Sequence, residues 1–195
     1  MTAGHHALSS SRLCLRRWRE ADRDAFAALN ADARVMEFFP ALLTRAQSDA
    51  MIDHIEGHFG EHDFGFWAVE VPSVAPFIGF VGLFTKRFPA HFTPCVEVGW
   101  RLAFAYWGKG YATEAARLAL AHGFGPLGLS DVVSYTTVTN RRSRAVMERL
   151  GMRRDPADDF DHPELSDGHP LRPHVLYRLD ANSFSATGAQ RRNMR

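Results

Sequence analysis

The stretch from Val96 to Phe124 places the tightest constraint on how this chain of 195 residues folds. Its first residues alternate between two sets, which are Val96, Val98 and Trp100 on one side and Glu97, Gly99 and Arg101 on the other. A period of two residues predicts a strand. From about Ala112 onward, alanine and leucine side chains recur at helical spacing as far as Phe124. The stretch therefore predicts a strand that passes through one short connection into a helix.

The connection between this strand and this helix reads Trp-Gly-Lys-Gly-Tyr-Ala-Thr over residues 107–113. Gly108 and Gly110 permit a tight turn and a close approach of the backbone to a ligand. The free amide groups of a helix N-terminus and the helix dipole attract a phosphate group, and the Lys109 ammonium adds a positive charge. We therefore interpret residues 107–113, called the cradle below, as a binding site for a pyrophosphate.

Two known phosphate-binding patterns do not fit the cradle. The nucleotide P-loop pattern, Gly-x-x-x-x-Gly-Lys-Ser/Thr, is not present in it. The dinucleotide pattern, Gly-x-Gly-x-x-Gly, fails because Thr113 stands where the third glycine is required. A nucleotide-binding protein is therefore a disfavoured alternative, and a glycine-rich turn without any ligand is the other one.

Composition and charge narrow the class of protein further. The formal net charge of +1 argues against binding to nucleic acid or to a membrane surface through charge, so we expect neither partner. The sequence has no signal-peptide pattern and no run of about 18 apolar residues. Cys14 and Cys95 lie in strand-like segments and form no metal or redox motif. These observations predict a cytoplasmic protein with reduced thiols.

Hydrophobic periodicity predicts an α/β protein with one mixed sheet. Strands are predicted at 12–16, 64–71, 76–85, from 96, at 131–139 and at 173–180, and helices at 20–30, 44–62, 112–124 and 140–150. The fourth strand, its helix and the fifth strand are expected to form a right-handed crossover. The polar segment 153–172 is expected to be a long loop or insert. We expect a flexible N-terminus over 1–10, one domain over 11–180 and a disordered tail over 181–195.

Four segments together carry a resemblance to a known family. They are Arg12-Leu13-x-Leu15-Arg16, Glu97-Val98-Gly99-Trp100, the run from Tyr106 to Ala115, and the run from Asn140-Arg141-Arg142-Ser143 to Leu150-Gly151-Met152. Through them the chain resembles the GNAT superfamily of acetyl-CoA-dependent N-acetyltransferases over roughly 11–180. Within it, the chain is similar to the branch that includes the ribosomal-protein N-terminal (alanine/serine) acetyltransferases. The cradle is the most specific segment, although Trp107 stands where the general pattern has Arg or Gln.

The resemblance implies a fold and a way of binding acetyl-CoA. It implies a mixed, mostly antiparallel sheet of about six to seven strands flanked by helices, in which the fourth and fifth strands splay. The pantetheine arm then lies between these strands, and backbone amides of the cradle hold the pyrophosphate. The residues implied to contact acetyl-CoA are Trp100, Arg101, Leu102, Trp107, Gly108, Lys109, Gly110, Tyr111, Ala112, Thr113, Asn140 and Ser143.

Acetylation of an amine requires a neutral amine, an oxyanion site and a proton for the departing thiolate. The resemblance implies direct attack in a ternary complex, so no nucleophilic side chain is needed. Many members of the superfamily have a tyrosine acid at the place of Met147, whereas in this branch a serine serves the thiol, here Ser143. Ser143 is alternatively an ordinary residue of the first helical turn. Asn140 is expected to cap the helix and also to contact CoA.

Several residues are candidates for the general base. Glu97 lies on the fourth strand, where the family often presents a carboxylate to the amine, and its alternative is a solvated or ion-paired glutamate. The acidic insert supplies Asp159, Asp161 and His162, which are otherwise solvated loop residues. A histidine titrates in the useful pH range. The sequence leaves the choice among these four residues open.

Three histidines recur every four residues in the second predicted helix, at positions 54, 58 and 62. Neighbouring histidines at this spacing can chelate a metal. They are displaced by one position from the apolar stripe of Ile55 and Phe59, which favours a boundary at the edge of solvent, so we expect no metal. In the family this helix often borders the acceptor pocket, so contact with substrate is a further alternative. Phe38 and Phe39 are likewise candidates for a wall of that pocket.

The sequence therefore predicts an N-acetyltransferase that moves the acetyl group of acetyl-CoA to a primary amine. The acceptor is either a protein N-terminus or a small molecule, and the acidic insert favours a small or cationic one. The rival from another class is a non-catalytic acyl-CoA-binding or sensor module. Monomer and homodimer are both compatible with the sequence, as is a longer acyl group.

Overall fold

The computed structural model describes residues 7–192 of the chain. These residues form two compact units. Of the described residues, the first unit takes 7–84 and Gly99–Ala119, and the second takes Thr85–Val98 and 120–192. No helix within the described residues is both long and apolar enough to span a membrane.

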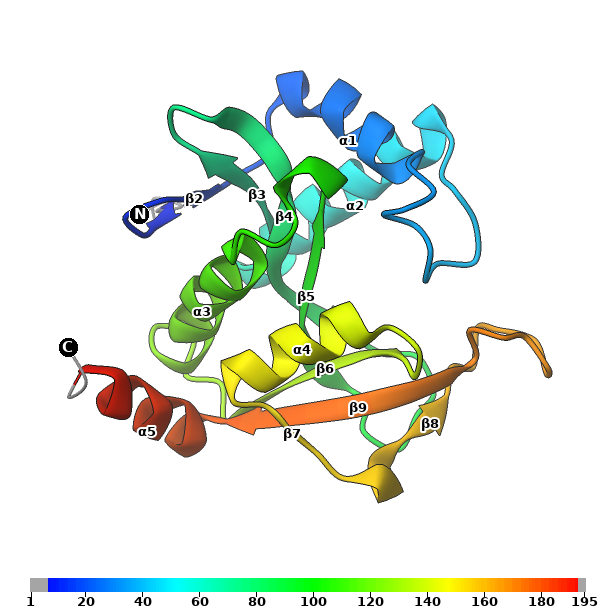
Figure 1. The fold of residues 1–195 in the computed structure, drawn as a ribbon, viewed down its shortest axis with the longest axis vertical. Coiled ribbons are helices and arrows are strands. Elements are labelled where there is room, and N and C mark those ends of the chain that lie inside the picture. Colours follow the sequence, from blue (N-terminus) through cyan, green and yellow to red (C-terminus); the bar gives the residue numbers. More distant parts are fainter. Residues whose placement is uncertain (1–6, 193–195) are drawn as a thin grey trace. The chain divides into compact units, whose positions relative to one another are not determined.

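Four antiparallel strands and two helices build most of the first unit. The strands β1 (Leu8–Ser9), β2 (Cys14–Arg16), β3 (Phe66–Val71) and β4 (Ala75–Lys86) pair in chain order. The helix α1 (Arg23–Asn30) follows the 3-10 turn η1 (Glu20–Asp22) and lies beside α2 (Arg45–His62), as Figure 1 shows. The helix predicted over 20–30 therefore starts as a 3-10 turn.

Residues at its two ends determine where α2 begins and stops. The Thr44 side chain accepts from the amide of Gln47, whose own side chain accepts from the amide of Thr44, and this capping box starts the helix. Asp63 ends α2 in the left-handed conformation.

Trp18 contacts Phe26 and Phe77, with ring centroids 4.9 and 5.4 Å away. Such edge-to-face and tilted contacts stabilise the core beyond the burial of apolar area.

The stretch from Val96 to Phe124 folds as the sequence predicts. It contains β5 (Cys95–Leu102), the 3-10 turn η2 (Phe104–Tyr106) and α3 (Tyr111–Phe124), after which the chain enters β6 (Asp131–Thr137). β5 and β6 are parallel and pair through Glu97 and Val133. Parallel neighbours need a crossover connection, which α3 supplies. The strand, helix and strand predicted around the cradle are thus confirmed.

The second unit is organised around one antiparallel pair. β6 pairs with β9 (Pro173–Asp180) along seven residue pairs, from Asp131 with Asp180 to Thr137 with His174. The helix α4 (Arg141–Leu150) lies against β6 and buries Met147 and Leu150 (Figure 1). Gly151 ends α4 in the left-handed conformation, as the sequence predicts for its stop.

The strand order within the described residues is β1-β2-β3-β4-β5-β6-β9-β7, in which β7 is Arg153–Arg154, and β8 (Phe160–Asp161) pairs with β9. Only β5 and β6 run parallel among the pairs recorded for these strands. The six longer strands correspond to the six predicted from the sequence. The mixed, mostly antiparallel α/β sheet with flanking helices is therefore confirmed.

Two segments contain more structure than the sequence predicts. The insert 153–172, expected to be a loop, contains β7 (Arg153–Arg154), the 3-10 turn η3 (Pro156–Asp158) and β8 (Phe160–Asp161), and both strands pair with β9. The end of the chain, expected to be disordered, forms the helix α5 (Ala181–Arg192), and 193–195 lie outside the described residues. Asp180 caps α5 by accepting from the amide and hydroxyl of Ser183, and Phe184 packs on Phe124.

The expected flexible N-terminus falls partly outside the described residues. Of 1–10, the structure describes 7–10, in which Leu8 and Ser9 pair with Leu15 and Cys14. Short edge pairings of this kind depend on the partner strand and leave no periodic signal in a two-residue segment.

Candidate active site

The cradle makes a turn that only glycine adopts easily at two of its positions. Gly108 and Gly110 have φ angles of 74° and 80°, in the left-handed region. The helix α3 begins directly afterwards, with its first recorded helical bond from the amide of Glu114 to the carbonyl of Gly110 at 3.1 Å. The preceding amides of a helix have no acceptor inside the helix. The cradle therefore presents backbone donors at a helix N-terminus, which is the chemistry of an anion site.

Side chains from distant parts of the first unit hold the cradle in place. The Arg12 guanidinium donates to the carbonyl of Lys109 at 3.2 Å and to the carboxylate of Glu114 at 2.8 Å. The Ser10 hydroxyl donates to the same carboxylate at 2.5 Å. Burial alone would raise the pKa of Glu114, but the hydrogen bonds from Arg12 and Ser10 outweigh it and lower that pKa. The sequence alone did not indicate this role for Arg12 or Glu114.

Trp107 anchors the cradle to the end of β5. Its indole nitrogen donates to the carbonyl of Leu102 at 2.7 Å. The tryptophan that replaces Arg or Gln of the general pattern thus fixes the connection between strand and helix. The Leu102 carbonyl, predicted to serve the pantetheine arm, already accepts this bond. A carbonyl oxygen has a second lone pair for another donor.

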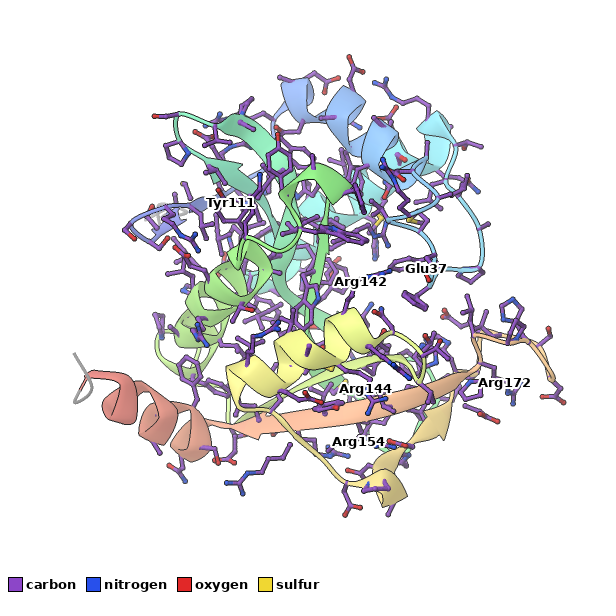
Figure 2. All side chains as sticks on the ribbon, in the orientation of Figure 1. Glu37, Tyr111, Arg142, Arg144, Arg154 and Arg172 are labelled. Atoms are coloured by element: carbon purple, nitrogen blue, oxygen red, sulfur yellow. The ribbon has the colours of Figure 1, made fainter. Side chains whose placement is uncertain are left out.

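The other predicted cofactor residues of the first unit lie in the cradle and on β5. The Lys109 ammonium lies 5.5 Å from the ring centre of Tyr106, and the Arg12 guanidinium lies 5.1 Å from that of Tyr111, which Figure 2 shows at the start of α3. Thr113 is buried. On β5, Trp100 is half-buried and Arg101 is buried.

Asn140 and Ser143 belong to the second unit, where they form the N-terminus of α4. The Asn140 side chain accepts from the amide of Ser143 at 3.1 Å and donates to the hydroxyl of Thr136 at 2.9 Å. The cap predicted from the sequence is confirmed. Both polar atoms of the Asn140 side chain already have a partner within the unit, so a CoA contact would use their remaining bonding capacity.

Glu97 is the candidate base with the most unusual environment. Its side chain is 13% exposed and lies 3.2 Å from the Lys86 ammonium. The Tyr135 hydroxyl donates to the same carboxylate. Burial raises the pKa of Glu97, against the lowering by Lys86 and Tyr135. A carboxylate with a raised pKa is a stronger base than an ordinary glutamate.

Burial also shifts the pKa values of two side chains next to Glu97. Burial, with a smaller contribution from Glu97, raises the pKa of the Cys95 thiol to about 11. The pKa of Tyr135 is raised by burial and then by Glu97. Lys86 and Tyr135 are functional candidates that sequence reasoning missed. The only signal for Tyr135 was its position in a β-branched strand, which indicates packing rather than chemistry.

His162 lies in the aromatic cluster around Tyr135. Its ring centroid is 6.0 Å from that of Tyr135, 4.9 Å from Phe88 and 5.0 Å from His174. Burial lowers the pKa of His162. Glu97 and His162, predicted separately as bases, therefore both neighbour Tyr135 in the second unit.

The two aspartates of the insert lie in ion pairs instead. Asp159 accepts from Arg154 at 3.0 Å, and this bond holds the pKa of Asp159 below its usual value. Asp161 is 60% exposed and lies 3.3 Å from Arg172. Figure 2 labels both arginines, Arg154 near β7 and Arg172 beside β9. The lowered pKa makes Asp159 a weak base, and the exposure of Asp161 favours its alternative as a solvated loop residue.

The boundary position expected for the histidines of α2 is wrong for His58. That side chain is 7% exposed, its ring stacks on Phe84 at 3.9 Å, and its Nδ1 lies 2.8 Å from the carbonyl oxygen of Phe64. His54 and His62 contact this cluster, with ring centroids 5.4 Å from Phe84 and 4.4 Å from His58. Within residues 7–192, no group of three or more His, Cys, Asp or Glu could hold a metal ion.

Comparisons with known proteins agree with this fold. A family model described as an acetyltransferase (GNAT) domain matches residues 12–153. An uncharacterised N-acetyltransferase of Bacillus subtilis, YnaD, is 29% identical over 149 residues, which cover 76% of this chain and 83% of YnaD. The FsC-acetyl coenzyme A-N(2)-transacetylase of Aspergillus fumigatus is 37% identical over 95 residues, which are 48% of this chain and 36% of that protein.

Solved structures show the same fold. A GNAT-family acetyltransferase from Bacillus anthracis has a TM-score of 0.74 at 23% identity, covering 91% of this chain and 99% of the other. A Vibrio cholerae protein proposed to be a ribosomal-protein-serine acetyltransferase has a TM-score of 0.72 at 15% identity, covering 90% and 97%. At these identities the likeness shows the fold alone. With the family model spanning most of the chain, the protein belongs to the GNAT family and is an acetyl-CoA-dependent N-acetyltransferase.

Proposed function

We propose that this enzyme transfers the acetyl group to a primary amine by direct attack, with Glu97 as the general base. The observation that carries the proposal is the buried Glu97 carboxylate with its raised pKa, held by Lys86 and Tyr135. An alkyl ammonium must lose a proton before it attacks, and a base in reach raises the rate by about 100-fold or more. Glu97 meets this need better than Asp159, whose pKa is lowered by Arg154.

His162 is the second candidate for the base. Because its pKa is lowered, it is neutral at pH 7 and able to accept a proton. Its ring faces aromatic neighbours at 4.9 to 6.1 Å, so its surroundings are those of a packed side chain. Glu97 has both a hydroxyl and an ammonium directed at its carboxylate, which is the environment of a group that changes charge.

The remaining parts of the reaction follow from the same proposal. The cradle amides and Lys109 would hold the pyrophosphate of acetyl-CoA, which supplies the thioester. The amine nitrogen forms a bond to the acetyl carbon, its proton passes to Glu97, and the carbon–sulfur bond breaks. Ser143 would donate a proton or hydrogen bond to the departing thiolate. Its amide is fixed by Asn140, which supports a defined position for its hydroxyl.

The acceptor remains a protein N-terminus or a small amine in this proposal. The name of the Aspergillus relative supports amine acetylation in the wider family, and the Vibrio protein gives the ribosomal-protein branch as one source of acceptors. The acidic insert favours a cationic acceptor less than the sequence suggests, because Asp158, Asp159 and Asp161 pair with arginines. The two free cysteines support the cytoplasmic location that we propose.

Glu97→Gln tests the general base. We expect amine-dependent release of CoA thiol to fall by about 100-fold or more at neutral pH, with little change in the affinity for acetyl-CoA. In the wild type, kcat should rise with pH as the Glu97 carboxyl ionises, with a midpoint above the ordinary value of 4.5. The variant should lack this rise.

Glu148→Gln is the matched control. Glu148 also accepts from a tyrosine hydroxyl in the second unit, that of Tyr177, at 3.0 Å. The control should keep its turnover within a factor of about two, because surface-proximal substitutions outside a site have small effects. Unchanged turnover and an unchanged pH profile in Glu97→Gln would exclude Glu97 as the base. Acetyl-CoA binding without thiol release for any amine would contradict the proposed reaction.

A further inference from the structure

Arg101 is a buried cation for which no carboxylate partner is recorded among residues 7–192. Its side chain belongs to β5 and is 9% exposed. One guanidinium nitrogen, Nη1, donates to Asn30 Oδ1 at 2.6 Å. Its Nε is buried with no hydrogen-bond acceptor among the described residues. A neutral amide oxygen is therefore the recorded polar partner of a full positive charge.

The other buried arginine of the first unit shows how the fold satisfies such a group. Arg16 is 6% exposed, and Asp22 accepts from its two terminal nitrogens at 2.7 and 2.8 Å. Glu70 accepts from its Nε at 2.8 Å. The hydrogen bond that Arg16 donates to Asp22 is the largest cause of the raised pKa of Arg16. Burial alone lowers the pKa of Arg101, to about 10. A buried charge without a counter-ion is strongly unfavourable, so Arg101 is retained at a cost to stability.

Aromatic rings flank the guanidinium of Arg101. The ring of Phe39 lies 4.1 Å from the guanidinium carbon and that of Phe80 lies 5.4 Å from it. Asn30 is itself fixed, because its amide nitrogen donates to the hydroxyl of Ser48 at 3.1 Å. Phe39 is 37% exposed and belongs to the segment 31–44 between α1 and α2, so the residue beside the cation reaches solvent. Aromatic stacking occupies the faces of a guanidinium and keeps its in-plane donors for a ligand.

We propose that Arg101 and Asn30 form a subsite for a carboxylate, carried by the amine acceptor. A carboxylate matches the planar fork of arginine and supplies the negative charge that this site lacks. The inference rests on the proposed function for the amine and adds the class of acceptor, an amine that also bears a carboxylate, such as an amino acid. Phe39, a candidate for a wall of the acceptor pocket, lies beside the Arg101 guanidinium. A free carboxylate is the other source of the same chemistry.

The test compares matched amines with and without a carboxylate, such as phenylalanine and phenethylamine, in the thiol-release assay. The wild type should favour the carboxylate member by roughly 10- to 100-fold in kcat/KM, the range expected for a hydrogen-bonded charge pair. Arg101→Met should bring this ratio close to one, mainly through the KM of the acceptor. Arg101→Lys keeps the charge without the fork and should give an intermediate ratio.

Arg34→Met is the matched control in the same unit. The Arg34 guanidinium also lies 4.1 Å from an aromatic ring, that of Phe104, but it pairs with Asp32 at 2.6 Å. The control should keep the wild-type ratio. If the wild type acetylates both amines of a pair equally well, the acceptor carboxylate is refuted, while the proposed function stands. Failure of every amine would refute the proposed function instead, and it would not affect the following binding measurement.

Thermal unfolding without acetyl-CoA separates binding from a purely structural role. Acetate at raised concentration should raise the Tm of the wild type, relative to chloride at equal ionic strength, and leave that of Arg101→Met unchanged. Unliganded Arg101→Met should be at least as stable as the wild type, because it removes an uncompensated buried charge. If Arg101→Met does not fold, the same comparison uses Arg101→Lys. If acetate raises the Tm but the wild type does not prefer the carboxylate-bearing amine, the site is supported and its ligand is a free carboxylate. If acetate does not raise the Tm and the wild type does not prefer the carboxylate-bearing amine, the subsite is refuted.

Discussion

His58 packs between aromatic side chains of the first unit, with its ring stacked on Phe84 at 3.9 Å. Burial lowers its pKa from 6.5 to about 4, against a smaller raising effect of the Phe64 carbonyl. The folded protein therefore keeps His58 neutral at pH values where the unfolded chain binds a proton. The stability that this difference provides is fully present above about pH 6.5 and is lost as the pH falls toward 4.

The expected size of this effect follows from the pKa difference. Over the whole interval it amounts to about 3 kcal/mol, since one pKa unit is about 1.4 kcal/mol. Tm measured between pH 8 and pH 5 should fall for the wild type and fall less steeply for His58→Phe, which keeps an aromatic ring. The slope should not vanish, because the pKa values of His122, His162 and His174 are also lowered. Equal slopes for the two proteins would contradict a buried neutral His58.

A single substitution at Ser143 can distinguish a role in catalysis from a role in binding acetyl-CoA. If its hydroxyl serves the departing thiolate, Ser143→Ala lowers kcat by more than it weakens acetyl-CoA binding, because the contact strengthens in the transition state. Steady-state kinetics together with a direct CoA-binding measurement distinguish the two effects.

Ser183→Ala provides the control for Ser143→Ala. Both serines stand in the first turn of a helix of the second unit, and the side chain three residues earlier accepts from the amide of each, Asn140 for Ser143 and Asp180 for Ser183. The Ser183 variant should keep its turnover. A Ser143 variant that behaves in the same way would restrict Ser143 to an ordinary helical role.

At the scale of the element, the turn before α3 depends on backbone conformations that favour glycine. Gly110→Ala introduces a side chain at φ 80°, where an L-residue costs about 1–2 kcal/mol. The added Cβ would meet only Arg12 Nη2 at 3.6 Å, so backbone strain rather than a clash is the expected effect. A shift of the cradle amides should weaken acetyl-CoA binding by about tenfold, which isothermal titration calorimetry can measure.

Gly57→Ala makes the same chemical change inside α2. A Cβ at Gly57 meets no atom within 4 Å, and alanine is favoured over glycine in a helix by about 1 kcal/mol. This control should raise the Tm and leave acetyl-CoA affinity unchanged. Retained affinity in Gly110→Ala would mean that the phosphates bind elsewhere.

At the scale of the whole molecule, a ligand that binds only the folded protein raises its stability. At about 100 times its dissociation constant, acetyl-CoA or CoA should add about 2.7 kcal/mol. For a chain of this length that corresponds to a rise in Tm of roughly 5–10 °C. ATP and NAD should give smaller shifts, because the cradle lacks the glycine patterns of nucleotide and dinucleotide sites. Equal protection by ATP would contradict specific recognition of CoA.

The sequence determined the features that depend on the local backbone. The alternation around Val98, the caps at Asn140 and Gly151, and the glycines of the cradle predicted the strand, the helices and the turn that the structure contains. These signals are local because a turn at positive φ or a helix cap involves only a few neighbouring residues. Short pairings such as β7 and β8 left no such signal, since they depend on β9.

Only the tertiary structure decided which polar side chains meet. It paired Arg12 with Glu114 across 102 positions, placed Lys86 and Tyr135 against Glu97, and left Arg101 with Asn30 instead of an acid. It also buried His58, which helical spacing alone had left at the edge of solvent. Side-chain pKa values depend on burial and on neighbouring charges, and both are properties of packed elements rather than of residue order. The sequence could therefore name the candidate residues of the site, but their chemistry follows from the neighbours that folding gives them.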